Sequence, residues 1–324
     1  MKTIQLLFFL LIASCGNAQL DGLLIERTLL TNISESRLYP KLTSVNGERR
    51  EWKAAYAYID SIHIEEISYR SDGLKVKGML VRPKREGKYP SIIYNRGGNR
   101  DFGEIKIEQA ALFMGQIAKE GYVVIASQYR GNAGGEGREE FGGKDVNDVL
   151  ILTEVLKEIE GADSERIGMY GWSRGGMMTY IALSKTDKIK AAVVGGAVSD
   201  ARESVKDRPQ MEAGVYTELI PDYEANKEEE LAKRSAVLWV DQFPKNVPIL
   251  LLHGTSDWRV KPTQSLNLAL QFEKYRIPHR LILFEGGDHG ISEHREEVNE
   301  QVTAWFDRFL KMDEALPNME YHGK

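Results

Sequence analysis

The sequence predicts an α/β fold in which helices cover both faces of a mainly parallel, twisted sheet. Short apolar runs alternate along the chain with longer amphipathic segments, which is the order expected of β-α units. Strands joined through helices run parallel, so we expect most of the sheet to be parallel. The predicted strands include residues 91–95, 122–126, 166–170 and 247–252, and the predicted helices include residues 104–120 and 144–160.

The first strands of the sheet are expected to be antiparallel. Residues 62–70 and 74–82 alternate apolar and polar positions around Ser71-Asp72-Gly73, a pattern that predicts a hairpin. The preceding segment, residues 19–61, is polar and partly helical, and its strongest helical pattern covers residues 48–59.

One catalytic domain over residues 62–311 accounts for the composition, with an extension over residues 19–61 and a tail over residues 312–324. A hydrophobic content of 42% is enough for a large core. The net charge of −5 argues against general nucleic-acid binding, which requires a basic surface. Residues 201–245 interrupt the rhythm of strands and helices, and we expect this insertion to form a helical lid over the site.

Residues 1–18 have the character of a targeting segment. Lys2 precedes an apolar run over residues 6–13 that is too short to span a bilayer as a stable helix. Residues 12–15 resemble a bacterial lipobox, in which Cys15 would be acylated, while residues 16–18 also suit signal peptidase. We therefore expect an exported protein that is periplasmic, secreted or tethered to a membrane through lipidated Cys15.

The segment Gly171-Trp172-Ser173-Arg174-Gly175 carries the strongest functional signal. It is a G-x-S-x-G pattern placed between a predicted strand and a predicted helix, a turn that projects the serine hydroxyl from the edge of a sheet. The helix N-terminus would add the backbone N–H of Arg174 to stabilise a developing oxyanion. The alternative is a glycine-rich connection without chemistry. The context favours Ser173 as the nucleophile of an α/β-hydrolase.

A serine nucleophile needs a base, and His289 is the best of six histidines. α/β-Hydrolases follow the order nucleophile, acid, histidine, which excludes His63. His289 lies in a glycine-flanked loop after the apolar run 281–284, where α/β folds place their sites. Capping of the next helix is the alternative role for His289.

Asp257 is the predicted acid partner of His289. It is the first carboxylate after the apolar run 247–252, and sequential strands are usually neighbours in such sheets. An aspartate there would orient His289 and stabilise its imidazolium form. Asp200 is the rival acid, and either aspartate could instead cap a helix.

These motifs resemble the catalytic domain of prolyl oligopeptidase-type serine peptidases, including the dipeptidyl peptidase IV and acylaminoacyl peptidase branches. The resemblance covers roughly residues 62–311 and includes residues 130–149, the Ser173 elbow, residues 253–260 and residues 288–291. It implies an acyl-enzyme mechanism on short peptides. No H-E-x-x-H motif is present and Cys15 is the only cysteine, so we expect no metal and no other cofactor.

Two features depart from the propeller-bearing members of that group. About sixty residues precede Ile62, too few for two propeller blades. Arg96-Gly97-Gly98 resembles the His-Gly-Gly loop of the acylaminoacyl branch and of many esterases. We therefore expect the oxyanion hole to use backbone N–H groups of Arg96, Gly97 and Arg174. The Arg96 side chain would hold a substrate carboxylate or, as the preferred alternative, a structural salt bridge.

The sequence therefore predicts a serine hydrolase and leaves three hypotheses for its role. The first is a peptidase acting on short peptides, and the second is a carboxylesterase, for example one that deacylates carbohydrate esters. The third is a non-catalytic binding protein of the same fold, against which the intact triad argues. Trp172 and Trp258 are candidate substrate contacts because they adjoin Ser173 and Asp257.

Overall fold

The structure is a computed structural model that describes residues 22–323. The predicted targeting segment and Cys15 lie outside the described residues. Within residues 22–323, no helix is both long enough and apolar enough to cross a membrane.

A single large sheet organises the described part of the chain, with strand order β1-β4-β5-β7-β6-β8-β9-β10-β11. The β1, β4 and β5 strands are antiparallel to their neighbours, and the strands from β7 to β11 in this order run parallel. The predicted mainly parallel sheet with antiparallel first strands is therefore confirmed. The strands of the sheet are β1 (Leu24–Leu29), β4 (Ile62–Ser71), β5 (Leu74–Pro83), β6 (Tyr89–Asn95), β7 (Val123–Ser127), β8 (Ala162–Trp172), β9 (Ile189–Gly195), β10 (Ile249–Gly254) and β11 (His279–Phe284).

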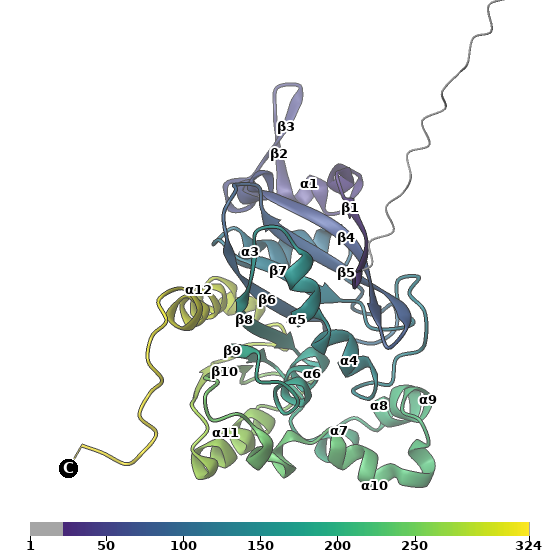
Figure 1. Ribbon diagram of the computed structural model, residues 1–324, viewed down its shortest axis with the longest axis vertical. Helices are drawn as coiled ribbons and strands as arrows, with labels where there is room; N and C mark the ends of the chain where they lie inside the picture. Colours follow the sequence, from purple (N-terminus) through teal and green to yellow (C-terminus); the bar gives the residue numbers. More distant parts are fainter. Residues whose placement is uncertain (1–21, 324) are drawn as a thin grey trace, which may run out of the picture.

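Helices cover both faces of this sheet (Figure 1). On one face lie α4 (Asp145–Leu150), α5 (Leu152–Val155), α6 (Arg174–Leu183) and α11 (Thr263–Tyr275). On the other lie α2 (Ile107–Gln109), the π-helical turn η3 (Ala110–Met114), α3 (Gly115–Ala118), α12 (Arg295–Phe306) and the final turn η9 (Asp307–Lys311).

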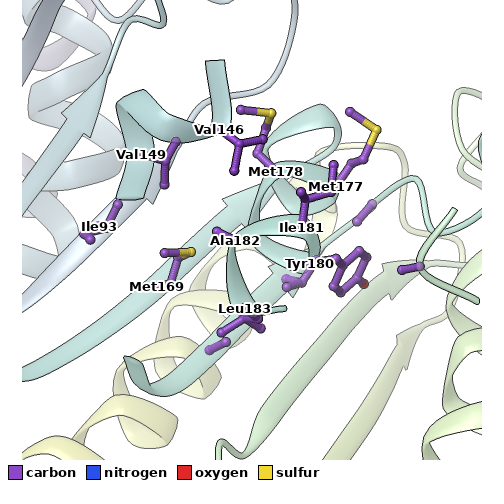
Figure 2. Close-up of a cluster of buried hydrophobic side chains, with 14 of the residues drawn as sticks. Ile93, Val146, Val149, Met169, Met177, Met178, Tyr180, Ile181, Ala182 and Leu183 are labelled. Atoms are coloured by element: carbon purple, nitrogen blue, oxygen red, sulfur yellow. The ribbon is translucent and has the colours of Figure 1, made fainter. Parts of the chain in front are cut away.

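The central strands are apolar on both sides because successive side chains of a strand point to opposite faces. In β10, Ile249 and Leu251 belong to the first buried cluster, while Leu250 and Leu252 belong to the second. Figure 2 shows part of the first cluster, where the α6 side chains lie between the sheet and α4. Both faces of the sheet are therefore covered, and the predicted site residues follow the carboxyl ends of its parallel strands.

The helix predicted over residues 48–59 is wrong for the first half of this range and is a 3-10 helix in the second half. Arg49–Trp52 forms the strand β3, which pairs with β2 (Thr43–Asn46) in a hairpin that projects from one end of the molecule (Figure 1). Residues after it form a 3-10 helix, η2 (Ala54–Ser61). The charged residues of this segment suit an exposed hairpin as well as an exposed helix, and the Trp52 ring packs edge-on against Tyr39 at 5.4 Å. The other short elements before β4 are η1 (Asn32–Glu35) and α1 (Tyr39–Leu42).

The insertion between β9 and β10 is helical, as the sequence predicts. Figure 1 shows its helices gathered at the end of the molecule opposite the β2-β3 hairpin. Its elements are α7 (Ala201–Asp207), α8 (Pro209–Met211), the π-helical turn η5 (Glu212–Tyr216), α9 (Thr217–Leu219), α10 (Tyr223–Lys233), η6 (Ala236–Leu238) and η7 (Val240–Gln242).

Candidate active site

Ser173 occupies a strained turn between β8 and α6. Its backbone has φ 58° and ψ −123°, a region that non-glycine residues rarely adopt. The Ser173 N–H donates to the Gly195 carbonyl oxygen at 2.8 Å, which ties the turn to β9. A Cβ atom on Gly175 would lie 1.9 Å from the Asn95 oxygen, and one on Gly171 would lie 2.2 Å from the Gly175 oxygen. Only glycine therefore fits at these two positions of the G-x-S-x-G pattern.

Asp257 and His289 meet where β10 and β11 end. These strands are paired neighbours, and His289 Nδ1 lies 2.7 Å from Asp257 Oδ2. Asp257 Oδ1 accepts the backbone N–H groups of Arg259 at 2.8 Å and Val260 at 3.0 Å. Burial alone would raise the pKa of Asp257, but hydrogen bonds from His253 and His289 outweigh it and hold this pKa well below its usual range. An ionised Asp257 keeps the proton of His289 on Nδ1 and leaves Nε2 free to accept one.

His253 is a second histidine at Asp257 that the sequence analysis did not identify. Its ring is fully buried, with Nε2 2.8 Å from the Val260 carbonyl oxygen and 3.3 Å from Asp257 Oδ2. A carbonyl oxygen only accepts, so Nε2 carries a proton and Nδ1 accepts from the Ser265 hydroxyl at 2.7 Å. The available signal was the position of His253 inside an otherwise apolar strand, four residues before Asp257.

Asp200 has a structural position instead. It is the N-cap residue of α7 and accepts the Arg202 N–H at 3.0 Å. The same oxygen, Oδ1, accepts from Ser235 Oγ at 3.2 Å, and Oδ2 pairs with the Arg202 guanidinium at 2.7 Å. The structure therefore brings Asp257, and not Asp200, to His289.

The loop after β6 touches the serine turn. A Cβ atom on Gly97 would lie 3.3 Å from Ser173 Cβ and 3.1 Å from the Trp172 oxygen, so the Gly97 backbone lies directly against the turn. On the other side, Arg174 is the first residue of α6, and its N–H has no acceptor within the helix. The residues predicted to supply oxyanion donors thus flank Ser173.

The Arg96 side chain shapes this loop and does not form the expected salt bridge. It is 1% exposed, and its guanidinium donates to the carbonyl oxygens of Gln128 at 2.9 Å and Arg100 at 3.1 Å. Burial and the nearby Arg174 lower the pKa of Arg96. No carboxylate within residues 22–323 pairs with it, and it is one of the residues that line a cavity beside Ser173. Backbone carbonyl groups here replace the carboxylate that the sequence suggested.

The side chain of Arg174 forms the main ion-pair network below the site. It is 3% exposed, and it pairs with Glu139 and, at 2.6 Å, with Asp145. It also donates to the Gly98 carbonyl oxygen at 3.0 Å. One cation therefore joins the serine turn to the loop after β6 and to the segment before α4. The sequence motif leaves this position variable, so only the three-dimensional contacts show its role.

Ser173 and His289 line a larger and a smaller cavity. The larger, of about 640 Å³, extends over Gly97 toward α12. The smaller, of about 80 Å³, faces the helical insertion, which contributes Ser204, Arg208, Met211 and Tyr216 to its wall. The insertion therefore borders the site, as expected of a lid.

The two predicted tryptophan contacts differ in their positions. Trp172 lines the larger cavity, and its Nε1 donates to the His289 carbonyl oxygen at 2.8 Å. Trp258 is 66% exposed and is not among the residues that line either cavity. Its ring lies 5.4 Å from the guanidinium carbons of both Arg208 and Arg259. Trp258 thus contacts residues of the smaller cavity without lining that cavity itself.

Comparison with known proteins identifies the family of the chain. Residues 109–313 match the prolyl oligopeptidase family. The chain belongs to this family. The predicted resemblance and the predicted α/β-hydrolase fold are therefore confirmed, and the chain is a serine hydrolase.

The relatives of the chain differ greatly in length. It is 30% identical over 247 residues to the uncharacterized peptidase YtmA of Bacillus subtilis. This match covers 75% of this chain and 93% of YtmA. It is 25% identical over 293 residues to dipeptidyl-peptidase 5 of Porphyromonas gingivalis, of which it spans 42%. The acylaminoacyl peptidase of Pyrococcus horikoshii superposes with a TM-score of 0.68 at 25% identity, over 86% of this chain and 47% of that one.

The Arg174 network gives a prediction about stability. Glu139→Gln should lower the free energy of unfolding by about 3–5 kcal/mol, because it removes one carboxylate from a buried arginine. Glu218→Gln is the matched control, since Glu218 pairs with Arg100 at the surface and should contribute about 0–1 kcal/mol. Urea unfolding of both variants measures the difference. Equal losses of unfolding free energy in the two variants would show that Glu139 contributes no more than a surface ion pair.

Proposed function

We propose that this protein is a serine peptidase that cleaves short peptides through an acyl-enzyme. Ser173 is the nucleophile, His289 the general base and Asp257 the acid that orients it. The observation that carries the proposal is the combination of a strained Ser173 turn with the 2.7 Å contact between His289 Nδ1 and Asp257 at the same cavities. Membership of a peptidase family supports amide bonds as the substrate.

The proposed reaction starts with attack of Ser173 Oγ on the scissile carbonyl carbon. His289 Nε2 takes the serine proton, and the ionised Asp257 stabilises the resulting imidazolium. The negative oxygen of the tetrahedral intermediate accepts hydrogen bonds from the N–H groups of Arg174 and Gly97. His289 then gives its proton to the leaving amine as the carbon–nitrogen bond breaks. A water molecule, activated by His289, repeats these steps and releases the acyl group.

His253 acts in this mechanism only through Asp257. Its Nε2–H and the two backbone N–H groups surround the carboxylate of Asp257, so that few of its lone pairs remain free. These donors favour the ionised form of Asp257, and its geometry is fixed before substrate arrives. His253 is thus a positioning residue.

A carboxylesterase is the second candidate function, and the larger cavity favours it. The cavity of about 640 Å³ adjoins Ser173, and its wall includes many aromatic and aliphatic side chains. Tyr170 packs edge-on against Tyr94 at 5.5 Å and against Trp172 at 6.3 Å, which makes a preformed apolar surface. Such a surface suits an apolar acyl or alcohol group, and one triad cleaves both amides and esters.

Labelling tests the nucleophile. A fluorophosphonate probe should modify the wild-type protein at one site per chain, because among residues 22–323 only Ser173 combines the strained turn with a histidine at the same cavity. Ser173→Ala should abolish labelling. Full labelling of that variant, measured by intact mass, would show that another residue is the nucleophile, and absent labelling of the wild type would favour a non-catalytic binding protein.

Substitution of the two aspartates tests the acid. Asp257→Asn should lower kcat by roughly 10²–10⁴-fold, because the amide leaves His289 in the wrong tautomer. Asp200→Asn should lower kcat less than about 10-fold, since Asp200 caps α7. Circular dichroism should first show that both variants are folded. The opposite order of losses would reject Asp257 as the acid while leaving Ser173 unaffected.

A substrate panel decides between peptidase and esterase. Under the main proposal, kcat/KM should be measurable for aminoacyl and peptidyl p-nitroanilides as well as for activated p-nitrophenyl esters. Hydrolysis of the esters alone, across a range of acyl lengths, would favour the carboxylesterase. The Ser173→Ala variant is the control for spontaneous ester hydrolysis.

A further inference from the structure

Three arginine side chains line the smaller cavity beside Ser173, and only one of them has its charge compensated. Arg174 pairs with Glu139 and Asp145. No carboxylate within residues 22–323 forms an ion pair with Arg208 or Arg259, although both line the cavity with Ser173 and His289. We refer to this space, with Ser204 and Tyr216 in its wall, as the arginine cavity.

Arg208 is the more deeply placed of the two uncompensated arginines. It follows α7, and its Nε atom is buried without any hydrogen-bond partner among the described residues. Its Nη1 makes one contact, of 3.4 Å, with the Arg259 carbonyl oxygen. Burial lowers the pKa of Arg208, and the neighbouring Arg259 lowers it further, while Tyr216 and Asp257 oppose this shift only in part. Buried donors usually have an acceptor, so this atom points to one that a ligand supplies.

Arg259 is held at the same cavity by the segment that carries the acid. Its backbone N–H binds Asp257, two residues earlier, at 2.8 Å. The guanidinium groups of Arg259 and Arg208 each lie 5.4 Å from the Trp258 ring centre. An aromatic face attracts cations without neutralising them, so Trp258 keeps two like charges close together at the cavity. Their mutual repulsion would be relieved by an anion between them.

We propose that the arginine cavity binds the carboxylate of a glutamate or aspartate side chain in the acyl part of the substrate. The enzyme would then prefer to cleave after an acidic residue. This inference rests on the proposed serine peptidase function and names its substrate class. We assign the acyl side to the arginine cavity because Gly290, which follows the proposed general base His289, lines only the larger cavity. The larger cavity is therefore the one that would receive the leaving group.

The size and chemistry of the arginine cavity fit such a side chain. Its volume of about 80 Å³ far exceeds the roughly 10–15 Å³ that one water molecule needs. A guanidinium fork matches the two oxygens of a carboxylate. Ser204 Oγ accepts from Gln264 Nε2 at 3.3 Å, so its own hydroxyl proton remains available to the ligand. The apolar part of the wall, including Phe141 and Val198, excludes water from these contacts.

The test compares peptidyl p-nitroanilides that differ only in the residue before the anilide. Glutamate and glutamine have nearly the same shape, so their kcat/KM ratio isolates the charge. We expect the glutamate substrate to be favoured by roughly 10–100-fold, the range for hydrogen bonds to a charged group. Peptidyl diphenyl phosphonates with the same two residues should inactivate Ser173 with the same preference, which covers substrates that turn over slowly.

Variants assign this preference to the two arginines. Arg208→Gln and Arg259→Gln should each bring the glutamate-to-glutamine ratio close to 1, and Arg208→Lys should retain part of it. Lys206→Gln is the matched control. It removes one positive charge two positions before Arg208, but Lys206 is exposed, pairs with Glu203 and does not line the arginine cavity. This control should keep the wild-type ratio.

The outcomes separate this inference from the proposed function. A wild-type ratio near 1 with both reagents, or a ratio that survives in both Arg→Gln variants, would overturn the acidic preference. Fluorophosphonate labelling of Ser173 together with equal use of both substrates would reject the preference alone. Failure of labelling and of all hydrolysis would reject the serine peptidase function, and the inference with it.

Discussion

Close packing around the strained backbone of Ser173 is the constraint on which the site depends. A residue at φ 58° with a side chain stays in that conformation only if its surroundings hold it there. Here α6, β9 and the loop after β6 approach the turn so closely that Gly171 and Gly175 leave no space for a methyl group. Because β9 belongs to the sheet and α6 packs on it, the Ser173 turn is held by the core of the domain.

The charge state of Asp257 depends on the hydrogen bonds that surround its carboxylate. The pKa of Asp257 lies below its usual range because hydrogen bonds outweigh the cost of burial. Its contacts therefore stabilise the folded state fully above the ordinary aspartate pKa, near 3.9, and lose that contribution only as the pH falls through the lowered value. Protonation of Asp257 thus does not remove this contribution to stability in mildly acidic media.

The sequence could predict those features that local patterns encode. Apolar runs identified the central strands, and the G-x-S-x-G context located the serine turn. Strand order gave the pairing of Asp257 with His289, because the two residues follow strands that are consecutive in sequence and adjacent in space.

Side-chain contacts between segments that are distant along the chain could not be predicted from the sequence. Arg174 meets Glu139, 35 positions away, and Arg96 meets the Gln128 carbonyl group, 32 positions away. Neither contact leaves a periodic signal along the chain. The segment that forms β3 was predicted as part of a helix, because an exposed charged segment is compatible with the pattern of a helix and with that of a hairpin. The sequence did not indicate that Arg208 lines a cavity with Ser173, because the fold of the insertion brings the two residues together.

The insertion between β9 and β10 has a consequence for how this enzyme could diversify. It leaves one strand of the sheet and returns to the adjacent strand, so a change in its length or course need not alter the register of either. Ser173, Asp257 and His289 are all carried by loops outside it, whereas Arg208 and Tyr216 belong to it. Under our proposals, Arg208 therefore lies in a stretch of the chain separate from Ser173, Asp257 and His289, while Arg259 shares the segment of Asp257. Exchange of the insertion would replace one of the two arginines and leave the three proposed catalytic residues in place.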